Sequence, residues 1–355
     1  MTPRFHSLKI AEVRRETPDS VSLCFELPPA LRADYAFVPG QHLALRTHLD
    51  GEEVRRSYSI CSGLDDGELR VAIKKVGGGR FSRWANEQLK AGDAIDVMTP
   101  DGRFTVPVDA QHAKHYVAFA AGSGITPILS LAKTLLRREP HSRLTLVYGN
   151  RRAATSMFQE ELEDLKDRYL ARFALFNVFS REEQDVELFN GRIDATKVRA
   201  FLDTLIPVDS IDEAFVCGPA SMIDEVESAL HAAGVPTANV HVERFGTPGA
   251  AVAQAEPAAD ASLAKVTFIV DGLKREVQFQ SEHGSLLEAG AAAGLDLPFS
   301  CKGGMCCTCR ARLLEGQVKM RKNFALEQAD LDAGFVLTCQ SYPLSERVLL
   351  SFDDR

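Results

Sequence analysis

Cysteine spacing constrains this chain more than any other feature. Cys301, Cys306 and Cys309 form the pattern C-x4-C-x2-C in a glycine-rich stretch, and Cys339 follows about thirty residues later. Three sulfurs in one short loop and a fourth from a distant segment can converge only if the chain folds back on itself. Two adjacent glycines in the loop let backbone N–H groups approach a negatively charged group closely. The pattern therefore predicts a metal site.

The spacing favours an iron–sulfur cluster over two alternatives. A C-x4-C-x2-C run with a distant fourth cysteine is the ligand spacing of plant-type [2Fe-2S] clusters. A structural zinc site usually takes two close pairs, and Cys339 has no cysteine beside it. Buried, unreactive thiols are the remaining alternative. Cys307 has no place in the spacing and is interpreted as a small buried residue.

Length and composition limit the kind of protein that can contain this site. A chain of 355 residues with 45% hydrophobic residues supports two or three domains. The formal net charge of −8 argues against nucleic-acid binding. No apolar run is long enough to span a membrane, and the N-terminus lacks the apolar core of a signal peptide, so we expect a cytoplasmic protein. Eight cysteines in that compartment favour metal or redox chemistry over disulfides.

Residues 1–109 are predicted to form a small antiparallel β-barrel. Short segments with strand-like alternation are separated by turn signals such as Pro39-Gly40 and Asp66-Gly67. One helical segment interrupts them, at 81–89. The predicted strands are 8–13, 21–27, 41–45, 69–74 and 94–98.

Two motifs in this region carry chemistry. Arg56 and Tyr58 alternate on a strand, so one can pair with a phosphate and the other can stack on a flat ring. Gly77-Gly78-Gly79 opens the helical segment and offers free N–H groups to a second phosphate contact. Together, RxYS and the Gly-rich segment resemble the flavin-binding domain of the ferredoxin–NADP reductase family. The resemblance implies bound FAD, with the isoalloxazine held by Arg56, Tyr58 and Ser59 and the pyrophosphate by Gly79, Arg80, Phe81 and Ser82.

Residues 110–248 alternate between strand and helix, which predicts an α/β domain with a parallel sheet. The predicted strands are 116–120, 144–148, 173–179, 213–217 and 240–244. The predicted helices are 127–137, 158–169, 196–202 and 221–233. The paired histidines His112 and His115, between the first two domains, lack a third ligand nearby and are interpreted as surface residues.

The first strand of this domain runs into a glycine turn. Gly122 and Gly124 can bring backbone N–H groups to a pyrophosphate, and Pro127 suits the first turn of the following helix. The proline departs from the GxGxxG dinucleotide fingerprint. The segment instead resembles the GxGITP segment of the reductase family, which implies that Thr126 lies close to the flavin.

Further segments at strand ends resemble the nicotinamide site of the same family. Ser180 and Arg181 provide a hydroxyl beside a guanidinium, which suits the 2′-phosphate of NADPH and favours it over NADH, although Glu182 and Glu183 stand next to them. Phe245 either stacks on the flavin or closes the core. The complete set of predicted cofactor-binding residues in this domain is Gly122, Gly124, Thr126, Asn150, Arg151, Ser180, Arg181, Cys217, Gly218, Pro219 and Phe245.

The remaining chain is a tether and a third domain. Residues 249–264 are rich in alanine and are predicted to be a flexible linker. Residues 265–355 show a hairpin signal at Asp271-Gly272, a helix at 286–293 and strands on both sides of the cysteine loop. This part resembles plant-type ferredoxin domains, which implies a β-grasp-like α+β fold with Cys301, Cys306, Cys309 and Cys339 as the cluster ligands.

The three parts together indicate an electron-transfer reductase. The module order resembles the reductase components of bacterial multicomponent oxygenases. Through Arg55–Cys61, Cys301–Cys309 and Gly334–Pro343 it resembles the reductases of phenylacetyl-CoA epoxidases. The resemblance implies electron flow from NADPH through FAD and the cluster to a diiron oxygenase in phenylacetate degradation, without a catalytic acid or base. The alternatives are another multicomponent oxygenase or a hybrid-cluster protein as acceptor, or a flavin redox sensor without turnover.

Overall fold

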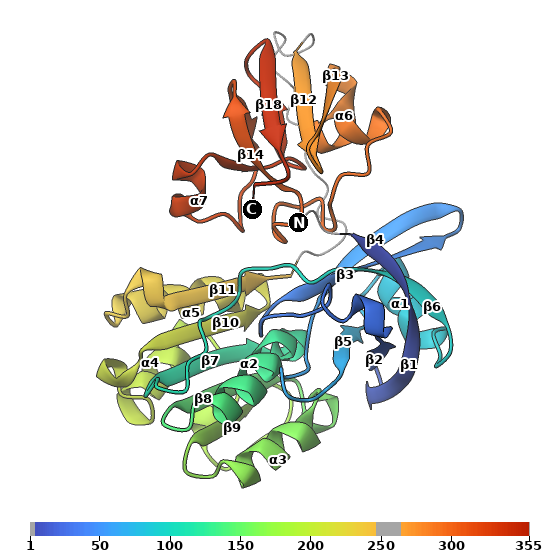
Figure 1. The fold of residues 1–355 in the computed structure, drawn as a ribbon. Helices are drawn as coiled ribbons and strands as arrows, with labels where there is room; N and C mark the ends of the chain where they lie inside the picture. Colours follow the sequence, from blue (N-terminus) through green and yellow to red (C-terminus); the bar gives the residue numbers. More distant parts are fainter. Residues whose placement is uncertain (1–3, 246–263, 355) are drawn as a thin grey trace. The chain divides into compact units, whose positions relative to one another are not determined.

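The computed structural model describes residues 4–245 and 264–354 (Figure 1). Backbone packing divides them into two compact units. One unit holds His6–Val54 and Tyr58–Phe245. The other holds the C-terminal residues together with Arg4, Phe5 and Arg55–Ser57. The predicted linker at 249–264 lies outside the described residues, except for Ala264.

The N-terminal sheet is the predicted antiparallel barrel. Its strand order is β4-β3-β6-β1-β2-β5, and an antiparallel bridge between Ile60 and Val71 joins its two ends. Helix α1 (Arg80–Glu87) contributes Phe81 and Ala85 to the interior, where the strands also direct their alternate side chains. The strands are β1 (Phe5–Thr17), β2 (Ser20–Glu26), β3 (His42–Leu49), β4 (Glu52–Ser59), β5 (Leu69–Lys74) and β6 (Ala94–Met98).

The α/β domain has the predicted parallel sheet, with strand order β11-β10-β7-β8-β9. Helices α2 and α3 share a core with one face, and α4 and α5 share a core with the other. The strands are β7 (His115–Ala121), β8 (Arg143–Asn150), β9 (Phe173–Phe179), β10 (Glu213–Gly218) and β11 (Val240–Arg244). The helices are α2 (Ile125–Arg138), α3 (Gln159–Arg168), α4 (Ala195–Thr204) and α5 (Ala220–Ala232).

The barrel and the α/β domain share one hydrophobic core. Cys61 and Ala72 of the barrel belong to the same buried cluster as α2 and α3. Phe104 meets Phe215 of β10 edge to face, with ring centroids 5.4 Å apart. Such aromatic contacts add to the burial of apolar area. The two predicted domains therefore pack as one body within the larger unit.

The C-terminal unit has the predicted α+β fold. Its five-stranded sheet has the order β13-β12-β18-β14-β16, in which β12 and β18 are parallel and the other pairs are antiparallel. Helix α6 (Leu286–Ala292) contributes Leu286 and Leu287 to its core. The strands of this sheet are β12 (Lys265–Val270), β13 (Leu273–Gln278), β14 (Arg310–Glu315), β16 (Phe335–Leu337) and β18 (Arg347–Ser351).

Two differences from the sequence predictions stand out. The pair β15 (Val318–Met320) and β17 (Ser341–Pro343) and the helix α7 (Gln328–Asp332) are too short to show a periodic pattern. The interpretation of His115 as a surface residue is wrong. It is 6% exposed, because it begins β7 inside the sheet, and its two ring nitrogens lie 2.9 Å from the hydroxyls of Ser210 and Thr145. Among the described residues, no helix is long and apolar enough to cross a membrane.

Candidate functional site

The two flavin motifs lie side by side in the barrel. Tyr58 of β4 and Phe81 of α1 have ring centroids 5.6 Å apart, and Trp84 meets Phe81 at 5.4 Å. Phe81 is buried and Tyr58 is half-buried, so Phe81 supports the tyrosine from the core side. Arg56 is half-buried and donates to the carbonyl of Arg55 at 2.7 Å. The structure thus brings Tyr58 of the RxYS motif to the start of the predicted pyrophosphate helix.

The glycine-rich turn leaves the start of α1 without a side-chain cap. Gly79 is the N-cap, and a Cβ there would lie 2.5 Å from the Ser82 hydroxyl, so the close turn requires glycine. The Ser82 hydroxyl accepts from the N–H of Val76. An uncapped helix start favours an anion such as a pyrophosphate. The Arg80 guanidinium points elsewhere and pairs with Glu52 at 2.6 Å and Asp50 at 3.1 Å.

The two predicted nicotinamide turns touch each other. A Cβ at Gly124 would lie 2.1 Å from the carbonyl oxygen of Cys217, and a Cβ at Gly218 would lie 2.7 Å from Met222. Only glycines allow the backbone of the first turn to approach the second so closely. Thr126 is buried and donates to the carbonyl of Ser123 at 3.0 Å, which holds the turn at the start of α2. Pro219, the N-cap of α5, is exposed beside them.

The remaining strand ends bring two arginines together. The N–H of Ser180 donates to the carbonyl of Asn150 at 3.0 Å, and the N–H of Arg181 donates to that of Arg151 at 2.9 Å. Ser180, Arg151 and Arg181 are exposed. The carboxylate of Glu182 accepts the N–H of Ala153 at 3.0 Å. Two exposed arginines thus follow adjoining strand ends, and the neighbouring Glu182 binds a backbone N–H group.

Glu243 is a candidate site residue that the sequence motifs did not single out. It lies on β11 opposite Cys217 of β10, and its carboxylate accepts from the Ser59 hydroxyl at 2.9 Å. Burial raises the pKa of Glu243 to about 8, and the Ser59 hydrogen bond offsets only part of that effect. The same burial raises the pKa of the Cys217 thiol. Phe245, just beyond β11, is 39% exposed and therefore does not close the core.

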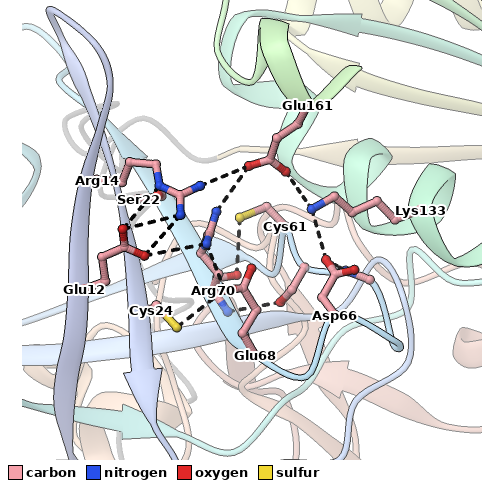
Figure 2. Close-up of polar contacts among 12 residues, drawn as sticks. Glu12, Arg14, Ser22, Cys24, Cys61, Asp66, Glu68, Arg70, Lys133 and Glu161 are labelled. Carbon is pink, nitrogen blue, oxygen red and sulfur yellow. Dashed lines mark hydrogen bonds and ion pairs between the residues drawn. The ribbon is translucent and has the colours of Figure 1, made fainter. Parts of the chain in front are cut away.

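An ion-pair network joins the barrel to the α/β domain (Figure 2). Glu161 of α3 accepts from Arg70 of β5 at 3.2 Å and from Lys133 of α2 at 2.6 Å. Lys133 also pairs with Asp66 of the barrel at 3.0 Å. The Arg70 side chain is 7% exposed and also pairs with Glu68 at 2.8 Å. We call Asp66, Glu68, Arg70, Lys133 and Glu161 the interdomain network.

The predicted cluster ligands converge in two pairs within the C-terminal unit. The thiol of Cys301 lies close enough to that of Cys306 to interact with it, and the thiol of Cys309 interacts in the same way with that of Cys339. The interaction with Cys306, together with backbone N–H groups that include that of Gly303, lowers the pKa of Cys301 to about 5. Two pairs of cysteine sulfurs fit a binuclear cluster, in which four cysteines serve two irons.

The remaining cysteine of the loop points away from these pairs. Cys307 is buried, has a left-handed backbone with φ of 55°, and donates from its sulfur to the carbonyl of Ala325 at 3.2 Å. Its surroundings agree with the interpretation of a small buried residue. Among the described residues, no three or more histidine, cysteine or acidic side chains lie together as a group that could hold a metal ion.

Family models match three successive parts of the chain. The oxidoreductase FAD-binding domain matches residues 7–106, and the oxidoreductase NAD-binding domain matches residues 119–228. The 2Fe-2S iron-sulfur cluster binding domain matches residues 268–344. The three matches follow the order barrel, α/β domain and C-terminal unit. They agree with the FAD, nicotinamide and [2Fe-2S] functions that the sequence motifs predict.

Full-length relatives share this organisation. The chain is 46% identical over 349 residues to a component of the 1,2-phenylacetyl-CoA epoxidase of Escherichia coli, covering 98% of each chain. It is 34% identical to the ferredoxin reductase component of 3-ketosteroid-9-alpha-monooxygenase of Rhodococcus rhodochrous, covering 97% of this chain and 96% of that protein. The structure of phthalate dioxygenase reductase shares the fold, with a TM-score of 0.58, 24% identity and 98% of each chain covered. The chain therefore belongs to the ferredoxin–NADP reductase family with a C-terminal plant-type [2Fe-2S] ferredoxin domain.

Proposed function

We propose that this protein is the reductase that carries electrons from NADPH through FAD and a [2Fe-2S] cluster to a diiron oxygenase, the phenylacetyl-CoA epoxidase of phenylacetate degradation. The observation that carries the proposal is the joint presence of two touching nicotinamide turns and four paired cysteines in one chain. The 46% identity to an epoxidase component supports the choice of partner. Eight cysteines without a disulfide among the described residues support a cytoplasmic location.

Each cofactor is bound by its own group of site residues. When bound, FAD accepts a hydride from the nicotinamide and releases single electrons to the cluster. Tyr58, Arg56 and Ser59 hold the flavin ring, and the start of α1 at 79–82 holds the pyrophosphate. The turns at 122–126 and 217–219 hold the nicotinamide, and Phe245 stacks on the flavin. Cys301, Cys306, Cys309 and Cys339 hold the cluster. The domain limits in this proposal are 1–109, 110–248 and 265–355, with the linker between the last two.

The choice of NADPH rests on the exposed strand ends of β8 and β9. Guanidiniums bind phosphate with paired hydrogen bonds, and Arg151 and Arg181 lie on adjoining backbone segments. The carboxylate of Glu182 accepts a hydrogen bond from the Ala153 N–H. That contact holds the carboxylate at the backbone, so it should repel a bound 2′-phosphate less than its position next to Arg181 suggests. Arg181→Ala should lower kcat/KM for NADPH by roughly tenfold and leave that for NADH nearly unchanged. Steady-state assays with both nucleotides measure this ratio, and an unchanged ratio would remove Arg181 from the 2′-phosphate site.

Reconstitution with the partner tests the function as a whole. The purified reductase is mixed with NADPH, the epoxidase oxygenase component and phenylacetyl-CoA under air. We expect NADPH consumption that depends on both the oxygenase and the thioester, together with an epoxidised product. A steroid monooxygenase oxygenase component with its substrate serves as the competing acceptor. Equal or greater turnover with that acceptor would contradict the assignment of the partner.

A further inference from the structure

Gln340 is a buried polar residue that contacts the cysteine loop from the turn between β16 and β17. It follows Cys339 directly and is 2% exposed. Its side-chain Nε2 donates to the carbonyl of Lys302 at 2.8 Å and to that of Cys339 at 3.1 Å. The same nitrogen lies 3.8 Å from the sulfur of Cys339. One amide therefore connects the loop, the fourth cysteine's backbone and its sulfur.

The orientation of this amide follows from its partners. Two carbonyl oxygens face the nitrogen, and a flipped amide would place Oε1 against both of them. In the present orientation, Oε1 is buried and has no hydrogen-bond partner among the described residues. A buried acceptor without a partner costs free energy. A methionine would fill the same volume without burying an unpaired acceptor. We therefore infer that the N–H donor of Gln340 is the group that matters at this position.

The carbonyl that Gln340 holds belongs to a strained residue. Lys302 has a left-handed backbone with φ of 51°, which a residue with a side chain adopts only when its surroundings hold it there. Its peptide connects Cys301 to Gly303, whose N–H donates to the Cys301 sulfur at 3.3 Å. On its other side, the carbonyl of Gln340 accepts from the N–H of Arg321 at 2.9 Å. Gln340 thus fixes the turn that directs an N–H group at a predicted ligand.

We propose that Gln340 is a positioning residue for the cluster, and this inference rests on the proposed set of four cysteine ligands. Its amide holds the Lys302 turn and presents an N–H group to the Cys339 sulfur. Groups that orient metal ligands affect both metal retention and reduction potential. N–H groups near the sulfurs stabilise the more negative, reduced cluster. Loss of the amide should therefore loosen the cluster and lower its potential.

Gln340→Met tests this inference because it keeps the length of the side chain and removes the donor. We expect about tenfold faster loss of the cluster's visible absorption in an iron chelator, a more negative potential in redox titration and an altered EPR spectrum of the reduced protein. Gln340→Glu keeps the shape and places carboxylate oxygens against both carbonyls, so it should lose the cluster at least as fast. Gln328→Met, on the exposed helix α7, is the matched control and should behave as wild type.

Two outcomes would overturn the inference, and they differ in scope. If Gln340→Met and Gln340→Glu retain the cluster as long as wild type does, with the same reduction potential and EPR spectrum, Gln340 does not position the cluster. That result would leave the assignment of the four cysteine ligands unaffected. Purified wild-type protein that holds no [2Fe-2S] cluster after anaerobic loading with iron and sulfide would overturn the ligand assignment as well.

Discussion

The hydrogen bond between Ser59 and Glu243 connects the flavin strand β4 to β11 at 2.9 Å. Burial raises the pKa of Glu243 from 4.5 to about 8. Between those pH values the folded protein binds one more proton than the unfolded chain at this group. The stability that the neutral carboxyl provides is complete below about pH 4.5 and is lost as the pH rises to 8. Glu243 therefore makes the stability of the larger unit fall with rising pH.

Replacing this carboxyl should remove that dependence. Glu243→Gln should be more stable than wild type by an amount that grows from about 1 kcal/mol at pH 5 to on the order of 4 kcal/mol at pH 8. Urea unfolding at several pH values, followed by far-UV circular dichroism, measures the difference. Glu183→Gln, at an exposed position, is the control and should show no such trend. A constant difference between Glu243→Gln and wild type would contradict the raised pKa.

Residues of the candidate site differ in how well the sequence predicts them. The turns at 122–126 and 217–219 are short sequence motifs, and Gly124 is required by its close backbone contact with Cys217, so the motifs alone reveal them. Glu243 belongs to no such motif. Its partner Ser59 lies 184 positions away in the chain, so no local pattern reveals the pair. The orientation of Arg80 depends on Glu52 and Asp50, which come from the β3–β4 hairpin. The sequence does not predict which side chains pair between elements that are far apart in the chain.

At the scale of elements, the interdomain network holds α2 and α3 against the barrel. Lys133 lies on α2, whose first turn carries the predicted nicotinamide residue Thr126. Its partner Asp66 lies in the loop that follows the flavin strand β4. Nearby, the Ser130 hydroxyl donates to the carbonyl of Ser62 at 2.7 Å. The network therefore ties the backbone near one cofactor to the backbone near the other.

Lys133→Met should weaken this connection. It leaves Asp66 facing Glu161 without a cation between them, which should cost about 1–2 kcal/mol, between the values for exposed and buried pairs. We expect slower flavin bleaching by NADPH, by several-fold, because orientation of the two rings controls hydride transfer. Anaerobic stopped-flow absorbance measures the rate. Lys90→Met, at an exposed position of the barrel, is the control. An unchanged rate in Lys133→Met would show that the network does not position the cofactors.

The secondary structure was largely predictable, for a physical reason. Strands β5, β6, β9 and β11 match their predicted limits because turn residues bound short apolar segments. Helix α2 begins two residues before Pro127, since a proline fits the first turn without losing a hydrogen bond. Elements of three to five residues, such as β15 and α7, form only because long-range contacts hold them.

In the whole molecule, the predicted cofactor sites are divided between the two units. The touching nicotinamide turns and most of the flavin motifs lie in the larger unit, and all four predicted cluster ligands lie in the C-terminal unit. Hydride transfer to the flavin should then need no cysteine of the loop. Electron transfer beyond the flavin should need all four predicted ligands.

Anaerobic stopped-flow mixing with NADPH separates these two electron-transfer steps. Absorbance is followed at the flavin band and at the cluster band, in wild type and in Cys339→Ser. In wild type we predict rapid bleaching of the flavin followed by bleaching of the cluster. In Cys339→Ser we predict flavin bleaching at a similar rate with little or no cluster signal. Absence of flavin bleaching in the wild type, or bleaching of the cluster before the flavin, would contradict the account.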